Sequence, residues 1–444
     1  MKAVQLIIVF TLITFFSIAQ NKAMLFDSLF TAMHARGQFN GSVLIAEKGK
    51  VVFEDTYGFA NREQKRDINK STSFNTGSVA KIFTAVAIQQ LAEKRELKVE
   101  TPIIRYLPDF PYPQITVHHL LIHAGGLSEC EPLLRKAQWN PSRIATNEDL
   151  LSALYDQKPE LKFTPGEKSQ YSNLGYILLA EVVEKVSGTD FAGYLEKHIF
   201  QPAGMKHTRI YDGNEVDSIA NIANGYVFYP FTGKYERAVS LPEFSFSNVV
   251  SGFEGDGNVY STASDLFRFC QALEDGVLLS ENSFETALEK HILARNMKGN
   301  NEYGNSFGYG WTVLDAPEKV INRGGELPGY LANIIWNVTE DQIFIYLMNE
   351  YLAYTSYNRE IFPAYMKILL SNKLEVPRLF ASVELTEMAV TSSIREMKDK
   401  IEEIRNHPDL YTIDVPGLKF LVHKLKQLGK HEKANLVMES FKTH

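Results

Sequence analysis

Cysteine is scarce in this sequence: Cys130 and Cys270 are the only two among 444 residues. They could pair once, but two cysteines do not provide the disulfide framework on which small secreted domains depend. The chain is long enough for one large domain or two ordinary ones, and 45% of its residues are hydrophobic. We therefore expect its stability to come from a packed core.

Runs of positive charge are also missing. The chain has 46 basic against 53 acidic residues, a formal net charge of −7, so binding to nucleic acid is disfavoured. It contains neither a P-loop nor a G-x-G-x-x-G fingerprint, so no nucleotide cofactor is expected. His119 and His123 have a spacing that can bind metal, but no glutamate or third histidine completes a zinc-enzyme pattern. We expect structural roles for both histidines, and neither a cofactor nor a metal.

Only one long hydrophobic run is present, and it lies at the N-terminus. Lys2 provides a positive start, residues 4–18 are almost wholly apolar, and the small residues Ser17 and Ala19 precede Gln20. This pattern predicts a secretory signal peptide over residues 1–19. An uncleaved membrane anchor is the alternative, although the run is short for a spanning helix. We expect export to the periplasm or the extracellular space, with no stable membrane insertion once the signal is removed.

Strand patterns lie toward both ends of the chain, and helix patterns fill its middle. Two β-rich runs, residues 42–46 and 51–54, flank a turn at residues 48–50 and predict a hairpin. Helices are expected in ITVHHLLIHAGGL up to Gly126, in YSNLGYILLAEVVEKVSG from an N-cap at Asn173 to Gly188, and in STASDLFRFCQALEDG after Ser261 or Thr262. Strands are expected in FGYGWTVL, YLANIIWNV and QIFIYLMN. This order indicates an α+β fold whose N- and C-terminal strands share one antiparallel sheet.

After about residue 375 the pattern becomes purely helical. Two segments each have apolar residues at helical spacing, which predicts two helices with one apolar face each. The first face consists of Ile394, Met397, Ile401 and Ile404, and the second of Leu418, Leu421, Val422, Leu425 and Leu428. A third helix is expected in HEKANLVMESF. The last helices weakly resemble half a tetratricopeptide repeat, and a single repeat cannot bury its own face. We therefore expect a main domain over residues 20–375 and a helical extension over 376–444. The extension either docks on the main domain or contacts a partner protein.

A hydroxyl and an amine stand at the front of an apolar helix in NTGSVAKIFTAVAIQQLAEK, residues 75–94. Ser78 and Lys81 are three residues apart and share one helix face. The positive end of the helix dipole would stabilise an alkoxide on Ser78. An amine held against an apolar surface is desolvated, which favours the neutral form that can accept the serine proton. This is the only S-x-x-K in the chain, although such a pattern also arises by chance. Ser78 is the candidate nucleophile.

A second candidate element is Tyr171-Ser172-Asn173. A tyrosine near a cationic lysine can have a lowered pKa and pass a proton between nucleophile and leaving group. Asn173 offers a donor and an acceptor to a substrate amide. The alternative is a buried aromatic residue before a helix cap, and a second Y-x-N occurs at Tyr303.

In this order the motifs resemble the serine β-lactamase-related family, which includes class C β-lactamases, penicillin-binding D-alanyl-D-alanine carboxypeptidases and esterases. The resemblance covers residues 39 to 348. It rests on FNGSVLIAEKGKVVFEDTYGFANRE, NTGSVAKIFTA, ITVHHLLIHAGGLSE, FTPGEKSQYSNLGYILLAEVVEKVSG, NVYSTASDLFRF and FGYGWTV. It implies a three-layer α/β/α fold, with an antiparallel sheet flanked by helices, and it favours Tyr171 over Tyr303.

The sequence departs from the family at the third motif, a strand that usually reads Lys-Thr-Gly or His-x-Gly. The matching stretch is NRGGELPGY, with Arg323 in the place of the usual lysine or histidine. Arginine keeps the charge but cannot shuttle a proton. It could clamp a substrate carboxylate with two parallel hydrogen bonds, or it could form a structural ion pair with Glu326 or another acid. The departure puts efficient β-lactam turnover in doubt.

The resemblance also implies an oxyanion hole and a substrate-binding strand. The N–H groups of Ser78 and Glu326 would hold the oxyanion, and Gly324 and Gly325 would let a substrate backbone approach closely. The sequence therefore predicts a serine hydrolase that forms an acyl-serine on a D-alanyl peptide, an ester or a β-lactam. The alternative is a non-catalytic protein that keeps the cleft to bind a cell-wall peptide or a partner.

Overall fold

The computed structural model describes residues 21–441, apart from residues 214, 230, 231, 233, 294–304 and 353–356. The expected signal peptide and Tyr303 lie outside the described residues. The chain falls into two compact units, one made of residues 41–224 and 239–349, the other of residues up to 40, 225–238 and from 350 onward. No helix in the described part of the chain is both long and apolar enough to cross a membrane.

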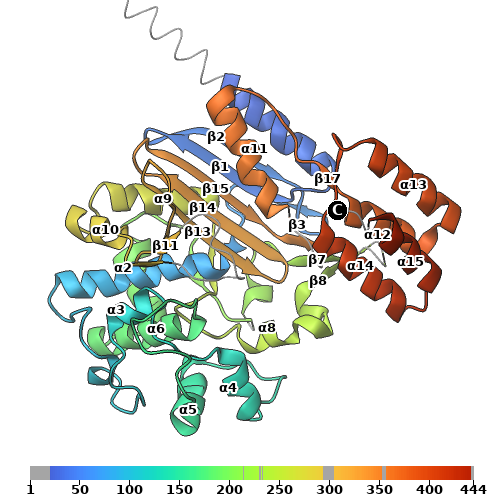
Figure 1. The fold of residues 1–444 in the computed structure, drawn as a ribbon. Coiled ribbons are helices and arrows are strands. Elements are labelled where there is room, and N and C mark those ends of the chain that lie inside the picture. Colours follow the sequence, from blue (N-terminus) through green and yellow to red (C-terminus); the bar gives the residue numbers. More distant parts are fainter. Residues whose placement is uncertain are drawn as a thin grey trace, which may run out of the picture. The chain divides into compact units, whose positions relative to one another are not determined.

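An antiparallel sheet of eight strands organises the larger unit (Figure 1). Its strands, in spatial order, are β10 (Ile292–Leu293), β11 (Ser306–Phe307), β12 (Thr312–Val313), β13 (Val320–Leu327), β14 (Tyr330–Asn337), β15 (Gln342–Met348), β1 (Gly41–Glu47) and β2 (Lys50–Tyr57). The pairing of β1 with β15 runs from Gly41 opposite Met348 to Glu47 opposite Gln342. This confirms the prediction that N- and C-terminal strands share one sheet.

The prediction of a single strand in FGYGWTVL is wrong. It forms two short strands, β11 and β12, which pair with each other across a turn. Gly310 in that turn has a φ of +81°, and a Cβ there would lie 3.0 Å from Cα of Ile82. The chain therefore turns at a residue without a side chain, where it approaches a buried helix closely.

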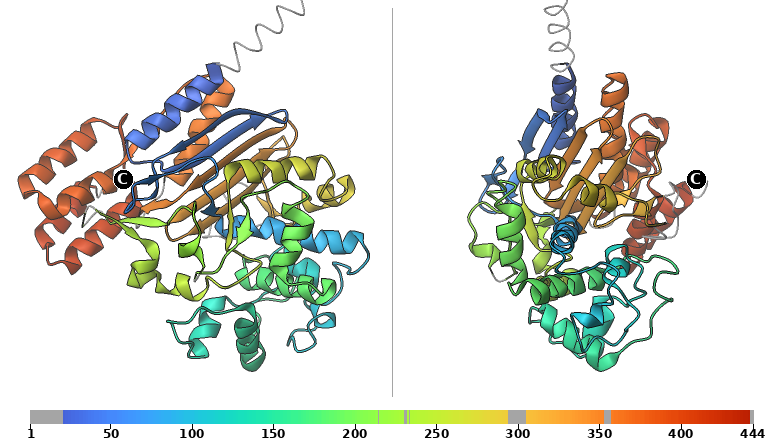
Figure 2. Two further views of the ribbon diagram at one scale, coloured as in Figure 1. Left: turned by 180° about the vertical axis from the view of Figure 1, so that it is seen from behind. Right: turned by 90° about the vertical axis from the view of Figure 1, so that its left-hand side faces the viewer.

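Helices of the larger unit cover the sheet and build the core (Figure 2). They are α2 (Ala80–Glu93), α3 (Val117–Leu121), α4 (Cys130–Lys136), α5 (Asn147–Gln157), α6 (Asn173–Ser187), α7 (Phe191–Leu195), α8 (Ser245–Val249), α9 (Ala263–Glu274) and α10 (Glu281–Ala287). Every residue of α2 from Ala80 to Leu91 is buried, as expected of a helix that is apolar nearly all round. α2 packs against α6, and α9 packs across β1 and β15. Cys130 and Cys270 are buried free thiols, so no disulfide supports this core.

Three helix ends test the sequence patterns. α3 ends at Leu121, short of the predicted end at Gly126, because His123 already has a φ of +58°. The N-cap of α6 is Ser172, whose Oγ accepts from the Gly175 N–H at 3.2 Å, so the predicted cap at Asn173 is wrong by one residue. Thr262 caps α9, as one of the two predicted alternatives.

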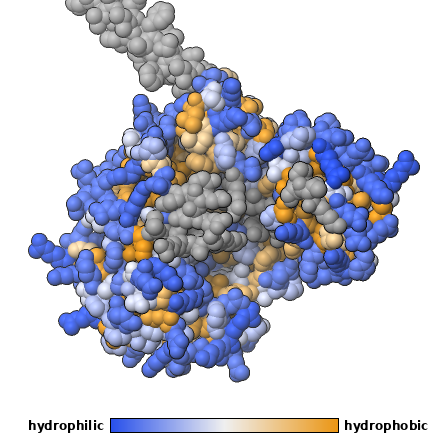
Figure 3. Space-filling model, in the orientation of Figure 1, coloured by the Kyte–Doolittle hydropathy of each residue, from blue (hydrophilic) through white to orange (hydrophobic). Residues whose placement is uncertain are grey.

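The smaller unit contains the C-terminal helices. Its elements are a helix over residues 21–35, β7 (Tyr226–Tyr229), β8 (Lys234–Arg237), β16 (Glu350–Leu352), α11 (Asn358–Ser371), β17 (Leu379–Phe380), α12 (Ala381–Thr391), α13 (Ile394–Asn406), β18 (Tyr411–Thr412), α14 (Val415–Gln427) and α15 (His431–Ser440). The three predicted helices are present, and α12 was not predicted. Both predicted apolar faces enter one core, although Ile394 stays outside that core and Leu428 is exposed. In Figure 3 the surface of α12–α15 is mostly hydrophilic, with a few hydrophobic residues among them.

Candidate active site

Ser78 lies in a single 3₁₀ turn, η1 (Gly77–Val79), that runs directly into α2. The preceding strand β5 (Phe74–Asn75) pairs with β9 (Val259–Ser261), and both N and Oγ1 of Thr76 donate to Val259 O, at 2.9 and 2.8 Å. The Oδ1 atom of Asn75 accepts from the Gly77 N–H at 2.9 Å. The nucleophile candidate is thus fixed between a hydrogen-bonded strand and a buried helix.

Lys81 is fully buried, and its ammonium nitrogen contacts the serine. Its Nζ lies 3.1 Å from Ser78 Oγ, 2.8 Å from Asn173 Oδ1 and 2.7 Å from the Asp256 carbonyl oxygen. Three acceptors match the three hydrogens of a protonated amine. A neutral amine would instead donate two hydrogens and accept the serine proton, so the neutral amine expected from the sequence stays a prediction.

Tyr171 is placed to accept that proton. Its phenol oxygen lies 2.7 Å from Ser78 Oγ and receives a hydrogen bond from Arg323 Nη2 at 3.0 Å. Burial alone would raise the pKa of Tyr171, but the positive charges of Lys81 and Arg323 and the hydrogen bond with Ser78 outweigh it and lower the pKa. A lowered pKa makes the phenolate of Tyr171 easier to form, which is the property that a proton acceptor for Ser78 needs.

His123 supports Tyr171 from behind. The two ring centroids are 4.4 Å apart, and His123 Nδ1 accepts from the Ser172 N–H at 3.2 Å. Burial first, then the charges of Arg323 and Lys81, hold the pKa of His123 well below its usual value. The ring is therefore neutral, in keeping with the structural role predicted for it. The described residues contain no group of three or more histidine, cysteine or acidic side chains suited to a metal ion.

Arg323 points into the protein and is only 2% exposed. Its Nε donates to the Ser78 carbonyl oxygen at 2.7 Å, and its Nη2 donates to Tyr171. In the described part of the chain it forms no ion pair with Glu326 or another acid. The ion pair predicted as one alternative is therefore absent from the described residues. The clamp on a substrate carboxylate stays a prediction, since these two bonds use only part of the guanidinium's five donors.

Strand β13 lies directly against the Ser78 turn. A Cβ on Gly325 would overlap the Thr76 carbonyl oxygen and lie 2.9 Å from Ser78 N, and a Cβ on Gly77 would lie 3.0 Å from Glu326 N. The amide nitrogens of Ser78 and Glu326 therefore occur at one contact between η1 and β13. Gly324 differs, since a Cβ there would meet nothing closer than Asn333 Oδ1 at 3.9 Å. Of these two glycines on β13, only Gly325 is required by a close approach of the protein's own backbone.

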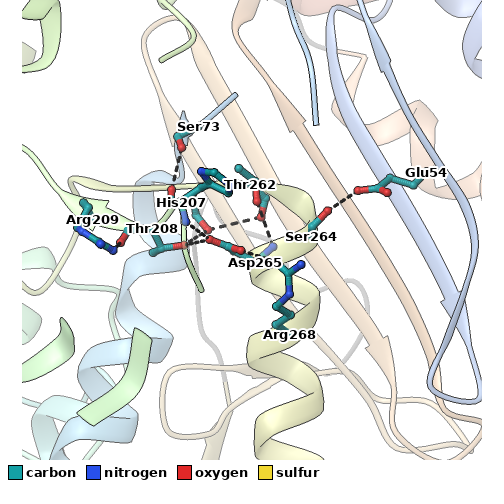
Figure 4. A network of polar contacts seen from close by, with 10 residues as sticks. Glu54, Ser73, His207, Thr208, Arg209, Thr262, Ser264, Asp265 and Arg268 are labelled. Atoms are coloured by element: carbon teal, nitrogen blue, oxygen red, sulfur yellow. Dashed lines mark hydrogen bonds and ion pairs between the residues drawn. The ribbon is translucent and has the colours of Figure 1, made fainter. Parts of the chain in front are cut away.

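A buried acid that the sequence patterns did not identify supports β9 from the other side (Figure 4). Asp265, at the start of α9, accepts from the His207 N–H at 2.6 Å, from Thr208 Oγ1 at 2.9 Å and from Arg268 at 2.6 Å. Thr208 also contacts Ser261 of β9 at 2.8 Å. Because β9 hydrogen-bonds Thr76, this network holds the strand on which the Ser78 turn depends.

A serine between a lysine and a tyrosine, at the head of a buried helix beside an antiparallel sheet, is the arrangement of the serine hydrolases with a β-lactamase/transpeptidase-like fold. The comparisons with known proteins agree. Residues 26–358 match the model of the family described as "Beta-lactamase". The chain is 36% identical to penicillin-binding protein 4* of Bacillus subtilis (strain 168), over 81% of this chain and 78% of that protein. The chain therefore belongs to the beta-lactamase family.

Two further relatives show the breadth of this similarity. Teichoic acid D-alanine hydrolase of Staphylococcus aureus is 27% identical, over 67% of this chain and 68% of that protein. The crystal structure of a penicillin-binding protein from Bacillus halodurans has a TM-score of 0.64 and 27% identity, and the match covers 77% of this chain and 99% of that one. The family contains penicillin-binding-protein-like and D-alanine hydrolases, and the fold is common to both.

Proposed function

We propose that this protein is an exported serine hydrolase that cleaves an amide or ester through an acyl-serine on Ser78. The observation that carries the proposal is the position of Ser78 Oγ, within hydrogen-bond distance of both Lys81 Nζ and the Tyr171 phenol oxygen, at 3.1 and 2.7 Å. Packing alone does not require a hydroxyl, an ammonium and a phenol to meet at the head of an apolar helix.

The geometry supports one assignment of roles. The Tyr171 phenolate takes the proton of Ser78 as Oγ attacks the substrate carbonyl, and Lys81 stabilises the negative charge that passes between them. The amides of Ser78 and Glu326 hold the oxyanion. Tyr171 then returns the proton to the leaving group, and a water molecule activated by the same phenolate releases the acyl group. Asn173 positions Lys81, and its side-chain amide is the proposed donor to the substrate.

The proposed substrates are D-alanyl peptides, D-alanyl esters and β-lactams. The names of two relatives support this range, since one refers to penicillin binding and the other to D-alanine hydrolysis of teichoic acid. The binding-only alternative was motivated by Arg323 and by the helical C-terminal extension, and the first of these has another explanation. Arg323 bonds Ser78 and Tyr171, so its presence is accounted for within a catalytic site.

The proposal that the protein is exported rests on the sequence of residues 1–19. We expect the mature chain to begin at Gln20. Fractionation of the native host, with the N-terminus of the recovered protein determined by mass spectrometry, would test this. A full-length chain in the cytoplasmic fraction would refute it.

The acyl-serine is tested by intact-protein mass spectrometry after incubation with a penicillin. We expect a mass gain of one penicillin in the wild type and none in Ser78→Ala. Ser142→Ala, at an exposed serine outside the site, is the matched control and should acylate like the wild type. Decay of the adduct would indicate β-lactamase turnover, and its persistence a penicillin-binding-protein-like enzyme. Acylation of Ser78→Ala, or an absence of Ser78-dependent hydrolysis of every ester, amide and β-lactam tried, would refute the proposal.

A further inference from the structure

Thr84 places a hydroxyl in the middle of the buried helix α2. It follows Lys81 by three residues and therefore lies on the same face of the helix. Its side chain is fully buried. A threonine inside a helix can bond the carbonyl oxygen four residues earlier in its own helix. Thr84 instead donates from Oγ1 to the Gly255 carbonyl oxygen at 2.6 Å, which joins α2 to the loop that precedes β9.

The loop that Thr84 contacts supplies one acceptor to Lys81. The carbonyl oxygen of Asp256, directly after Gly255, lies 2.7 Å from Lys81 Nζ. In the described part of the chain, Thr84 Oγ1 is the only donor that bonds the Gly255 carbonyl oxygen. The two peptide planes that carry these oxygens meet at the Cα of Asp256, so a rotation of the first plane changes the direction of the second oxygen. Two adjacent peptide groups therefore connect the Thr84 hydroxyl to the Lys81 amine.

Packing against α6 restrains the position of this loop but not the direction of its carbonyl groups. Gly255 has a φ of +99°, and a Cβ there would lie 2.5 Å from the Tyr176 carbonyl oxygen and 2.7 Å from the Ala180 Cβ. The loop therefore passes α6 at a residue without a side chain. The direction of a buried carbonyl depends on the donor that it meets, and for Gly255 this donor is Thr84.

The acceptors of Lys81 determine which way its amine points. The Asp256 carbonyl oxygen can only accept, and Asn173 Oδ1 accepts at 2.8 Å. Two hydrogens of the amine therefore point at these oxygens, whether the amine is neutral or protonated. The remaining position on the nitrogen, a lone pair or a third hydrogen, is directed at Ser78 Oγ, 3.1 Å away. A displaced Asp256 oxygen would let the amine turn away from the serine.

We propose that Thr84 is a positioning residue of the acyl-serine reaction, which holds the Asp256 carbonyl in place and so directs the Lys81 amine at Ser78. This inference rests on the proposed function and adds to it a residue that acts through Lys81. Because Lys81 acts on Ser78, loss of the Thr84 hydroxyl should slow the chemical step and leave substrate binding unchanged.

The test compares Thr84→Val, which keeps the shape of the side chain but removes the hydroxyl, with Thr84→Ser, which keeps the hydroxyl. Steady-state hydrolysis of the methyl ester of N-acetyl-D-alanine gives kcat and KM for each. We expect Thr84→Val to lower kcat by about 10-fold or more at an unchanged KM, because hydrogen bonds of a charged group are the strong ones. Thr84→Ser should recover most of that loss. Thermal melting verifies that each variant is folded, and Thr84→Ala removes the same hydroxyl if valine prevents folding.

The matched control is Thr386→Val, in α12 of the smaller unit. Thr386 is also fully buried, and its Oγ1 donates to the Ser382 carbonyl oxygen at 2.6 Å. Its loss should lower the melting temperature and leave kcat unchanged. Wild-type kcat in Thr84→Val and Thr84→Ala would refute the role of Thr84, as would an equal loss in Thr84→Ser or in the control. Hydrolysis that still depends on Ser78 would leave the proposed function standing. A wild type that hydrolyses no ester and is not acylated by penicillin would refute the acyl-serine proposal, and this inference with it.

Discussion

Replacement of Gly325 by alanine would test whether the contact between β13 and the Ser78 turn builds the oxyanion hole. The added Cβ would overlap the Thr76 carbonyl oxygen and approach Ser78 N to 2.9 Å. All of these obstacles are backbone atoms, so β13 and η1 must separate. Donors in an oxyanion hole act at about 2.7–3.1 Å, and removal of one typically lowers kcat by about 10²–10³-fold. We expect a loss of that size, and a free energy of unfolding lower by about 1–3 kcal/mol from overpacking.

Gly324→Ala is the matched control, one residue away on the same strand. Its Cβ would meet nothing closer than 3.9 Å, so the melting temperature should stay that of the wild type and kcat should fall much less. Steady-state hydrolysis of an ester under saturation, with thermal unfolding of both variants, provides the measurement. Wild-type kcat in Gly325→Ala, or equal losses in the two variants, would show that this contact does not position the oxyanion donors.

Three further predictions concern protons. Tyr171→Phe should lower kcat by about 10²–10⁴-fold with little change in melting temperature, because only the base is removed; near wild-type turnover would contradict this. Arg323→Gln should raise the pKa of Tyr171 and so move the rising limb of the pH profile of kcat/KM to higher pH by about one pH unit. A limb at the wild-type pH would show that Arg323 does not lower the pKa of the phenol. Burial and three acidic neighbours raise the pKa of Glu254 to about 7. Its ionisation therefore destabilises the fold as pH rises from about 4.5 to above 7. The free energy of unfolding of Glu254→Gln should exceed that of the wild type by about 1–3 kcal/mol at pH 8, and should equal it at pH 4.5. An equal gain at both pH values would contradict that sign.

Local spacing was enough to find the catalytic candidates that lie within one element. Ser78 and Lys81 meet because residues three apart share a helix face, and the hydrophobic run behind them already indicated a buried helix. The hairpin of β1 and β2 followed in the same way from alternating patterns around a short turn. Each of these features depends on residues close together in the sequence.

Contacts between distant segments have no signal in residue spacing, and it was the resemblance to a family that supported joining Tyr171 to Ser78. The Arg323 Nε bonds a carbonyl 245 residues away, and the third acceptor of Lys81 is a main-chain oxygen 175 residues away, for which side-chain patterns carry no signal. The early end of α3 has a similar cause. His123 leaves the helix and receives the N–H of Ser172, which lies 49 residues later in the chain. Contacts between distant segments determined these positions and overrode the local secondary-structure preference of the residues.

The guanidinium that joins Ser78 to Tyr171 has a consequence for where the enzyme can work. A histidine in that position would lose its charge near neutral pH, whereas an arginine keeps its charge throughout the range in which proteins remain folded. The export proposed from residues 1–19 would bring the enzyme into surroundings whose acidity the cell does not regulate. With Arg323 in place, the charge that stabilises its base does not vary with those surroundings.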